Sequence, residues 1–163
     1  MVQYAVYDSP LGPLLLEGEK NVLTGLWINC PIPENTVSLK EIPVFRQAAS
    51  WLDAYFRGVP KKPDFPLAPH GTAFQMLVWQ QLLEIPYGHT DTYGAIAREI
   101  AKILGKEKMS AQAVGQAVGR NPISIIIPCH RILGAKGQLT GYASGIDKKI
   151  WLLNHEGWKG ETK

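Results

Sequence analysis

A cysteine and a histidine stand side by side near the end of the sequence, where they could form a nucleophile and its base. Cys129 is followed directly by His130 and then by Arg131. A thiol becomes a nucleophile when a neighbouring base or cation favours the thiolate. A packed core cysteine is the plain alternative, because free cysteine is among the most buried residue types. The pair by itself leaves both interpretations open.

The residues before this pair favour presentation of the thiol at the edge of a rigid element. Residues 123–127 are an apolar run rich in isoleucine, which predicts a fully buried strand. Pro128 lacks a backbone N–H, so we expect the strand to end there. Cys129 and His130 would then stand at the end of the strand. Contact between adjacent residues in that position would run through a water molecule.

A carboxylate near the end of the chain is a candidate partner for the histidine. We expect a final helix over about 147–155, ended by Gly157. Glu156 lies at its carboxyl end, where the partial negative charge of the helix disfavours a carboxylate. Surface exposure would explain this position, and so would a nearby cation such as protonated His130. The second explanation gives a relay in which His130 takes the proton of Cys129 and Glu156 orients the imidazole.

Three helices are expected between the middle of the chain and this site. Thr72 and Gln75 form a capping-box pattern that opens the first helix. Ser110 suits the cap of the third. The expected ranges are 72–83, 93–103 and 111–118. Two short helices joined by a tight turn that contains glycine are the outline of a helix-turn-helix.

The third of these helices carries little bulk on one side. Ala111, Val114 and Val118 share a face that we expect to pack inward. The opposite face holds only glycine and glutamine, namely Gln112, Gly115, Gln116 and Gly119. Small residues allow close approach, either to another helix or to a DNA groove. We interpret this helix as a DNA recognition helix.

The first part of the chain predicts a small α+β scaffolding unit without chemistry of its own. Alternating apolar residues and turn signals predict three strands and one helix, over 2–7, 14–16, 22–28 and 43–56. Four prolines in residues 58–71 are typical of an extended connection. We therefore expect an N-terminal domain over 1–64, a linker over 65–71, and a C-terminal domain over 72–163 that carries the predicted helix-turn-helix and the Cys129 site.

Composition describes an ordinary globular protein with an uneven charge. Residues 1–70 hold 6 Lys and Arg against 7 Asp and Glu, whereas residues 71–163 hold 11 against 7. The net charges of −1 and +4 favour a C-terminal half that meets phosphates. No run is long enough for a membrane span, and two cysteines predict a reducing, cytoplasmic setting without a disulfide framework. The scattered histidines and cysteines predict no metal site.

The segment IIIPCHRIL, preceded by GRNP and followed by GYASGIDKKIWLLNHEG, closely resembles the O6-alkylguanine-DNA alkyltransferases, also called methylated-DNA–protein-cysteine methyltransferases. The resemblance covers about residues 72–157 strongly. It implies an α+β fold: a small antiparallel sheet with a helix in a ribonuclease H-like roll, then a mostly helical domain with a helix-turn-helix. It also implies irreversible, single-turnover transfer of an alkyl group to Cys129, without a cofactor. The substrate would be O6-alkylguanine in double-stranded DNA that a monomer binds through the minor groove, and the sequence leaves open whether O4-alkylthymine is also repaired.

The resemblance also assigns roles to further residues. It implies that Tyr93 offers its hydroxyl to guanine N3 and that Asn121 is a hinge between the recognition helix and the cysteine. The implied substrate-binding set is completed by Ile132, Tyr142, Ala143 and Ser144. The implied DNA-binding set is Thr92, Ala111, Gln112, Gly115, Gln116, Gly119 and Arg120.

Two positions depart from the pattern of the family. Gln112 stands where relatives commonly carry an arginine that fills the gap left by a flipped base, and Ala143 stands where many carry a serine. The first departure leaves open a DNA-binding relative with impaired base flipping. Two rivals from other classes are a DNA-binding module without chemistry and a cysteine hydrolase. The intact Cys129, His130 and Glu156 disfavour the former, and the predicted helix-turn-helix disfavours the latter.

Overall fold

The computed structural model describes residues 1–159, and the chain divides into two compact units. The first comprises Met1–His70 together with Pro122–Ser124, and the second comprises Gly71–Asn121 and the chain from Ile125 onward. The division after His70 lies inside the stretch that the sequence predicts as a linker. The units are described separately below.

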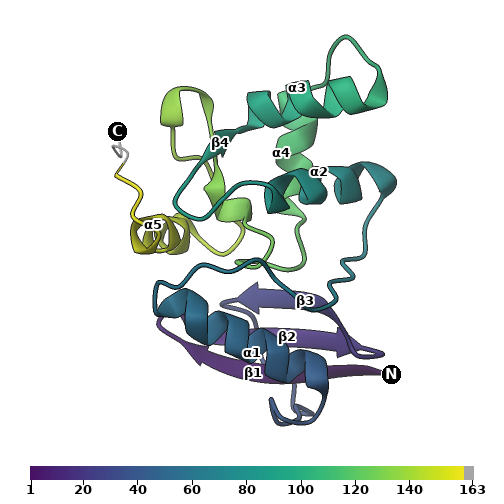
Figure 1. Ribbon diagram of the computed structural model, residues 1–163, viewed down its shortest axis with the longest axis vertical. Helices are drawn as coiled ribbons and strands as arrows, with labels where there is room; N and C mark the ends of the chain where they lie inside the picture. Colours follow the sequence, from purple (N-terminus) through teal and green to yellow (C-terminus); the bar gives the residue numbers. More distant parts are fainter. Residues whose placement is uncertain (160–163) are drawn as a thin grey trace. The chain divides into compact units, whose positions relative to one another are not determined.

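The first unit is a three-stranded antiparallel sheet with one helix. Its strands are β1 (Val2–Ser9), β2 (Gly12–Glu19) and β3 (Val22–Ile28), in the order β1-β2-β3. Helix α1 (Pro43–Phe56) contacts all three strands (Figure 1). The predicted sheet and helix are therefore confirmed, although β2 extends well beyond the expected 14–16. Because its partners on both sides supply hydrogen bonds, the strand includes the flanking turn residues.

The outer edge of β3 is covered by two segments that are distant in the sequence. The backbone of Leu23 donates to Pro66 O at 3.0 Å and accepts from Ala68 N at 2.8 Å. Leu26 bonds in the same way to Pro122 O at 2.8 Å and to Ser124 N at 3.0 Å. An unpaired strand edge is prone to aggregation, so these pairings protect the sheet. The proline-rich stretch is thus attached to the first unit from residue 66 to residue 68.

The second unit is built on three helices that contact one another. They are α2 (Ala73–Leu83), α3 (Tyr93–Leu104) and α4 (Ala111–Gly119). Side chains cap each of them: Thr72 forms the predicted capping box with Gln75, Thr92 accepts from Ala95 N, and Ser110 accepts from Ala113 N. The predicted helices therefore agree with the structure to within one residue at each end.

The predicted strand over residues 123–127 is wrong. Ile123 makes only an isolated bridge to Leu26, and the chain then turns, with Ile125 at a φ of 70°. A positive φ is unusual for a β-branched residue and does not occur within a regular strand. The isoleucines of this run are nevertheless buried, as their composition predicts. Burial alone does not distinguish a strand from a packed turn.

The chain after this turn returns to regular structure in short pieces. The 3-10 helix η1 (Cys129–Arg131) leads into β5 (Ile132–Leu133), which pairs in parallel with β4 (Asp91–Thr92). A second 3-10 turn, η2 (Ala135–Gly137), precedes α5 (Ile146–His155). Within residues 1–159, no helix has both the length and the apolar character needed to cross a membrane.

Replacement of Trp79 by phenylalanine tests the attachment of α2 to α4. Trp79 is 2% exposed, and its indole Nε1 donates to the Ala117 carbonyl at 2.8 Å. We expect Trp79→Phe to lower the free energy of unfolding by about 1–3 kcal/mol, because it removes a buried donor and leaves unfilled volume. Urea unfolding measures this loss. Gln80→Ala, on the exposed side of the same helix, should change stability by less than about 0.5 kcal/mol, and equal losses would contradict the assignment.

Candidate active site

The Cys129 thiol lies in the interior of the second unit. Cys129 is 6% exposed, and its amide donates to Ile127 O at 2.8 Å. The sulfur lies 3.7 Å from the hydroxyl of Tyr142. Burial raises the pKa of the thiol, while hydrogen bonds from Asn121 and Tyr142 and the charge of Lys149 act in the opposite direction. Because burial prevails, the thiol is protonated at neutral pH and needs a base to become a nucleophile.

The neighbouring histidine is buried against a carboxylate. His130 is fully buried, and its Nε2 lies 2.6 Å from Oε2 of Glu156. The glutamate follows the last residue of α5 and is 6% exposed. The predicted proximity of His130 and Glu156 is therefore present in the structure, and surface exposure does not explain the position of Glu156.

Arg131 fixes the charge on this carboxylate. Its Nε donates to Glu156 Oε1 at 2.7 Å and its Nη2 to Oε2 at 3.1 Å, while Nη1 donates to the carbonyl of Ile85 at 2.7 Å. The amide of Gly88 adds a bond to Oε1 at 3.1 Å. Burial acts to raise the pKa of Glu156, but its bonds to His130 and Arg131 hold that pKa far below the usual range. The charge of Arg131 is permanent, since a guanidinium is always protonated.

The ionised carboxylate determines which nitrogen of His130 can act as a base. An ionised Glu156 only accepts hydrogen bonds, so Nε2 of the imidazole carries the proton and donates it. Burial and the charges of Arg131 and Lys149 lower the pKa of His130 against the opposing effect of Glu156, and the resting ring is therefore neutral. Nδ1 is left with a free lone pair, and it has no hydrogen-bond partner among residues 1–159. A ring nitrogen with a free lone pair can accept a proton.

Lys149 lies close to the thiol and was not among the residues predicted from the sequence. It is fully buried on α5, and its ammonium donates to the Ile132 carbonyl at 2.6 Å. Burial lowers the pKa of Lys149 to about 8, against the opposing effect of the Cys129 charge. It is therefore still mostly protonated at pH 7 and favours a thiolate at Cys129. The sequence does carry one indication of this position. Lys149 precedes Leu152, Leu153 and Glu156 by three, four and seven residues, and residues at these spacings share one helix face.

Asn121 joins the end of the α4 segment to the residues before the cysteine. Its side-chain Nδ2 donates to Ile127 O at 2.8 Å, and both groups are buried. Ile127 O also accepts the amide of Cys129. The asparagine therefore holds the turn that presents the thiol, in the place where a hinge is expected.

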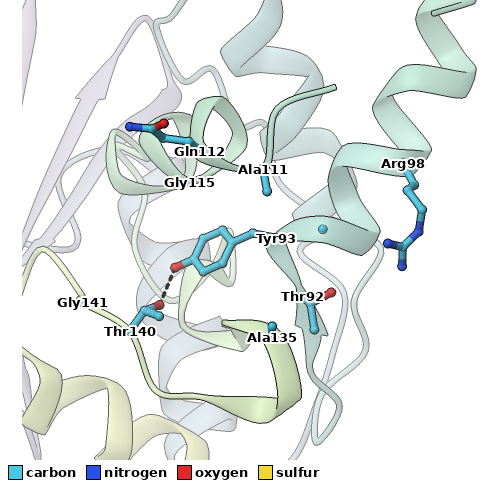
Figure 2. Close-up of a pocket in the computed structure, with 10 residues that line it drawn as sticks. Thr92, Tyr93, Arg98, Ala111, Gln112, Gly115, Ala135, Thr140 and Gly141 are labelled. Atoms are coloured by element: carbon cyan, nitrogen blue, oxygen red, sulfur yellow. Dashed lines mark hydrogen bonds between the residues drawn. The ribbon is translucent and has the colours of Figure 1, made fainter. Parts of the chain in front are cut away.

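A pocket of about 660 Å³ opens beside Tyr93, between α3, α4 and the loop after β5 (Figure 2). Tyr93 crosses it, and its hydroxyl is hydrogen-bonded to that of Thr140 at 2.9 Å. Gly141 lines the pocket, and the next residue, Tyr142, contacts the Cys129 sulfur. The lining brings together four residues of the expected DNA-binding set, Thr92, Ala111, Gln112 and Gly115. Among residues 1–159, Arg98 is the only charged residue that lines it.

The other three expected DNA contacts lie elsewhere on the second unit. Gln116, Gly119 and Arg120 line a separate hollow of about 680 Å³ beside the start of α2. A methyl group added at Gly119 would meet nothing within 4 Å in the described part of the chain. Crowding by another helix therefore does not explain this glycine. The prediction that Ala111 packs inward is wrong, because Ala111 is exposed at the first pocket. Ala117 is buried together with Val114 and Val118 instead.

The remaining expected substrate residues differ in exposure. Ile132 is fully buried and contributes its carbonyl to Lys149. Ala143 is exposed and Ser144 is half-buried. Both lie in a turn that the bond from Gly145 N to Tyr142 O closes at 2.9 Å. The turn can therefore offer backbone N–H groups, although Ala143 lacks a hydroxyl.

Acid should destabilise the protein through these buried groups. The pKa of folded His130 lies below its ordinary 6.5, so protonation is easier in the unfolded chain and stability falls as the pH drops below about 6.5. The lowered pKa of Glu156 adds a further loss below its ordinary 4.5. Urea unfolding at pH 7.5, 5.5 and 4 measures both. His130→Gln should flatten the curve between the two higher pH values, and an unchanged slope would contradict the assignment.

Comparisons with known proteins agree with this geometry. Residues 2–69 match the family model of the 6-O-methylguanine DNA methyltransferase ribonuclease-like domain, and residues 73–158 match that of its DNA-binding domain. A methylated-DNA–protein-cysteine methyltransferase of Methanosarcina acetivorans is 50% identical over 161 residues, covering 94% of this chain and 97% of that protein. The crystal structure of the Mycobacterium tuberculosis O6-methylguanine methyltransferase is 42% identical, with a TM-score of 0.81 over 100% of this chain and 97% of that one. The M. tuberculosis protein in complex with DNA is 44% identical, with a TM-score of 0.81 over 94% and 92% of the two chains. This chain belongs to the 6-O-methylguanine DNA methyltransferase family.

Proposed function

We propose that this protein repairs DNA by moving an alkyl group from the O6 atom of guanine to the sulfur of Cys129. The observation that carries the proposal is the buried His130–Glu156 pair, which leaves one imidazole nitrogen free as a base in the residue next to the thiol. Family membership supplies the substrate class, since the relatives are named for methylated DNA and a protein cysteine.

The reaction begins with removal of the thiol proton. His130 Nδ1 takes it, directly or through a water molecule, and Glu156 stabilises the imidazolium that results. The positive charge of Lys149 favours the thiolate while it exists. The sulfur then attacks the alkyl carbon in line, a carbon–sulfur bond forms, and the carbon–O6 bond breaks.

The electron pair of the broken bond leaves with the guanine. Donors aimed at the departing base lower the barrier, because negative charge develops there. Tyr93 is suited to donate to guanine N3 from the pocket side, and the turn of Tyr142 to Gly145 can donate backbone N–H groups near O6. The same chemistry would act on O4-alkylthymine, whose alkyl group is also bonded to an exocyclic oxygen of the base.

The pocket beside Tyr93 suits a base that has left the duplex. An enzyme cannot reach a base inside the stack, so it must flip the nucleotide out. Helix α4 presents small and polar residues at this pocket, and we propose that it lies in the minor groove with Arg120 near a phosphate. The complex of the M. tuberculosis relative with DNA supports this partner.

Mass spectrometry of the intact protein tests the transfer. After mixing with duplex DNA that contains O6-methylguanine, we expect one methyl group per molecule, on Cys129, because a thioether is not released by water. Cys129→Ala should abolish the transfer and still bind DNA, since its contacts with DNA lie on other residues. Methyl on Cys30, or repeated turnover of an acyl substrate, would contradict the proposal.

Gln112 supports a second candidate function, a DNA-binding relative that flips bases poorly. Gln112 is exposed at the pocket and can hydrogen-bond an orphaned base, but it lacks the charge and the planar stacking of arginine. The unstacking of a base costs a few kcal/mol, so the residue that fills the gap influences the flipping equilibrium.

Replacement of Gln112 by arginine separates these two functions. We expect Gln112→Arg to speed single-turnover repair of duplex DNA by about tenfold, since charge-assisted hydrogen bonds are roughly twice as strong as neutral ones. It should not change the reaction with free O6-alkylguanine base, which needs no flipping. Gln116→Arg adds the same charge at the other hollow and serves as the control, at fixed salt. Equal acceleration on duplex and free base would mean that Gln112 acts on the pocket.

A further inference from the structure

The Tyr93 hydroxyl is already engaged before any base enters the pocket. Its oxygen lies 2.9 Å from Oγ1 of Thr140, and either group can donate (Figure 2). Figure 2 shows the tyrosine reaching across the pocket from the start of α3 to the loop that carries Thr140. The bond therefore joins the residue proposed to donate to the base with a residue outside the substrate-binding and DNA-binding sets that the resemblance implies.

Packing fixes both partners of this bond. A Cβ added at Gly134 would come within 3.0 Å of the Thr140 methyl group, so that methyl lies close against the Gly134 backbone. The loop is itself closed by the bond from Gly134 N to Gln138 O at 2.7 Å. The Tyr93 ring lies beside Gly115 of α4, where an added Cβ would stand 3.6 Å from the ring. With the methyl group held on one side, the threonine hydroxyl is directed toward the tyrosine.

A phenol has one proton to donate, and its direction matters in this reaction. If Tyr93 donates to Thr140, that proton is not available to the departing base. If Thr140 donates to Tyr93 instead, the phenol proton is free to point into the pocket. Hydrogen bonds in a chain polarise one another, so a tyrosine that accepts from Thr140 is also the stronger donor.

We propose that Thr140 is a positioning residue for alkyl transfer: its hydroxyl donates to Tyr93 and so directs the Tyr93 proton to N3 of the departing guanine. This inference rests on the proposed function and names a part of it that acts through Tyr93. A threonine fits the role because its hydroxyl can accept in the free protein and donate once the base is bound. Thr140 touches neither the reacting carbon nor the sulfur in this arrangement.

Replacement of Thr140 by valine and by serine tests the proposal. Valine has the same shape without the hydroxyl, and we expect Thr140→Val to slow single-turnover transfer from O6-methylguanine DNA by about three- to tenfold, the rate equivalent of one hydrogen bond. Thr140→Ser keeps the hydroxyl and should stay within about threefold of the unmodified protein. In a Tyr93→Phe background, Thr140→Val should have no further effect, because its partner is gone.

A modified base provides a readout that a merely structural role would not move. In 3-deaza-O6-methylguanine a C–H group replaces N3, so the base offers no acceptor to Tyr93. We expect Thr140→Val to react with this substrate at the unmodified protein's rate. Equal slowing on both substrates would overturn the proposal in favour of a loop that has simply lost order. An unchanged or faster rate on O6-methylguanine would overturn it as well, because Thr140 would then only accept the Tyr93 proton and keep it from the base.

The same measurements separate this inference from the proposed function. The unmodified protein is assayed first, by the appearance of methyl on Cys129. Its absence there would end the proposed function and the Thr140 proposal together. Methylation of Cys129 by the unmodified protein, with rates indifferent to the Thr140 hydroxyl, would refute the role of Thr140 alone.

Discussion

One buried carboxylate holds together the part of the molecule that carries the chemistry. Glu156 accepts hydrogen bonds from His130 and Arg131 of η1 and from Gly88 in the turn after α2, two separate segments of the second unit. A buried charge is costly unless it is paired and fully hydrogen-bonded. Since Arg131 also binds the carbonyl of Ile85, the end of α5, the 3-10 helix η1 and the turn after α2 depend on the same group. Removal of the carboxylate would leave an unpaired guanidinium in the interior.

This arrangement links stability to reactivity. The arginine that makes a buried glutamate tolerable also keeps it ionised, and the ionised form selects the tautomer of His130. A neutral, buried imidazole then follows a cysteine whose thiol has a pKa that is raised by burial. In the proposed reaction, the protein thus stores an unreactive thiol together with the base that activates it. Lys149 contributes the positive charge that the thiolate needs once it forms.

Much of this could be predicted where local signals are strong. Capping residues and apolar spacing predicted the helices, and the unfavourable position of Glu156 at a helix end indicated its partner. The prediction for the run before Cys129 was wrong because isoleucine favours strands. In the structure Ile123 instead bridges to the edge of a distant strand, and the chain turns at Ile125 with a positive φ. The contacts of Lys149 and Thr140 could not be predicted for a related reason. These contacts are with partners that only the folded chain brings near, namely the carbonyl of Ile132 and the hydroxyl of Tyr93.

The pairing of β3 with residues 122–124 has a consequence for synthesis on the ribosome. The first unit is not a continuous piece of chain, because the backbone groups of Leu26 find their partners at Pro122 and Ser124. When residue 70 leaves the ribosome, this edge of the sheet is still unpaired, and it stays so until three complete helices of the second unit have followed. A fragment cut at the proline-rich stretch would carry the same exposed edge permanently. The nascent protein therefore passes through a stage in which association with other chains competes with its own completion.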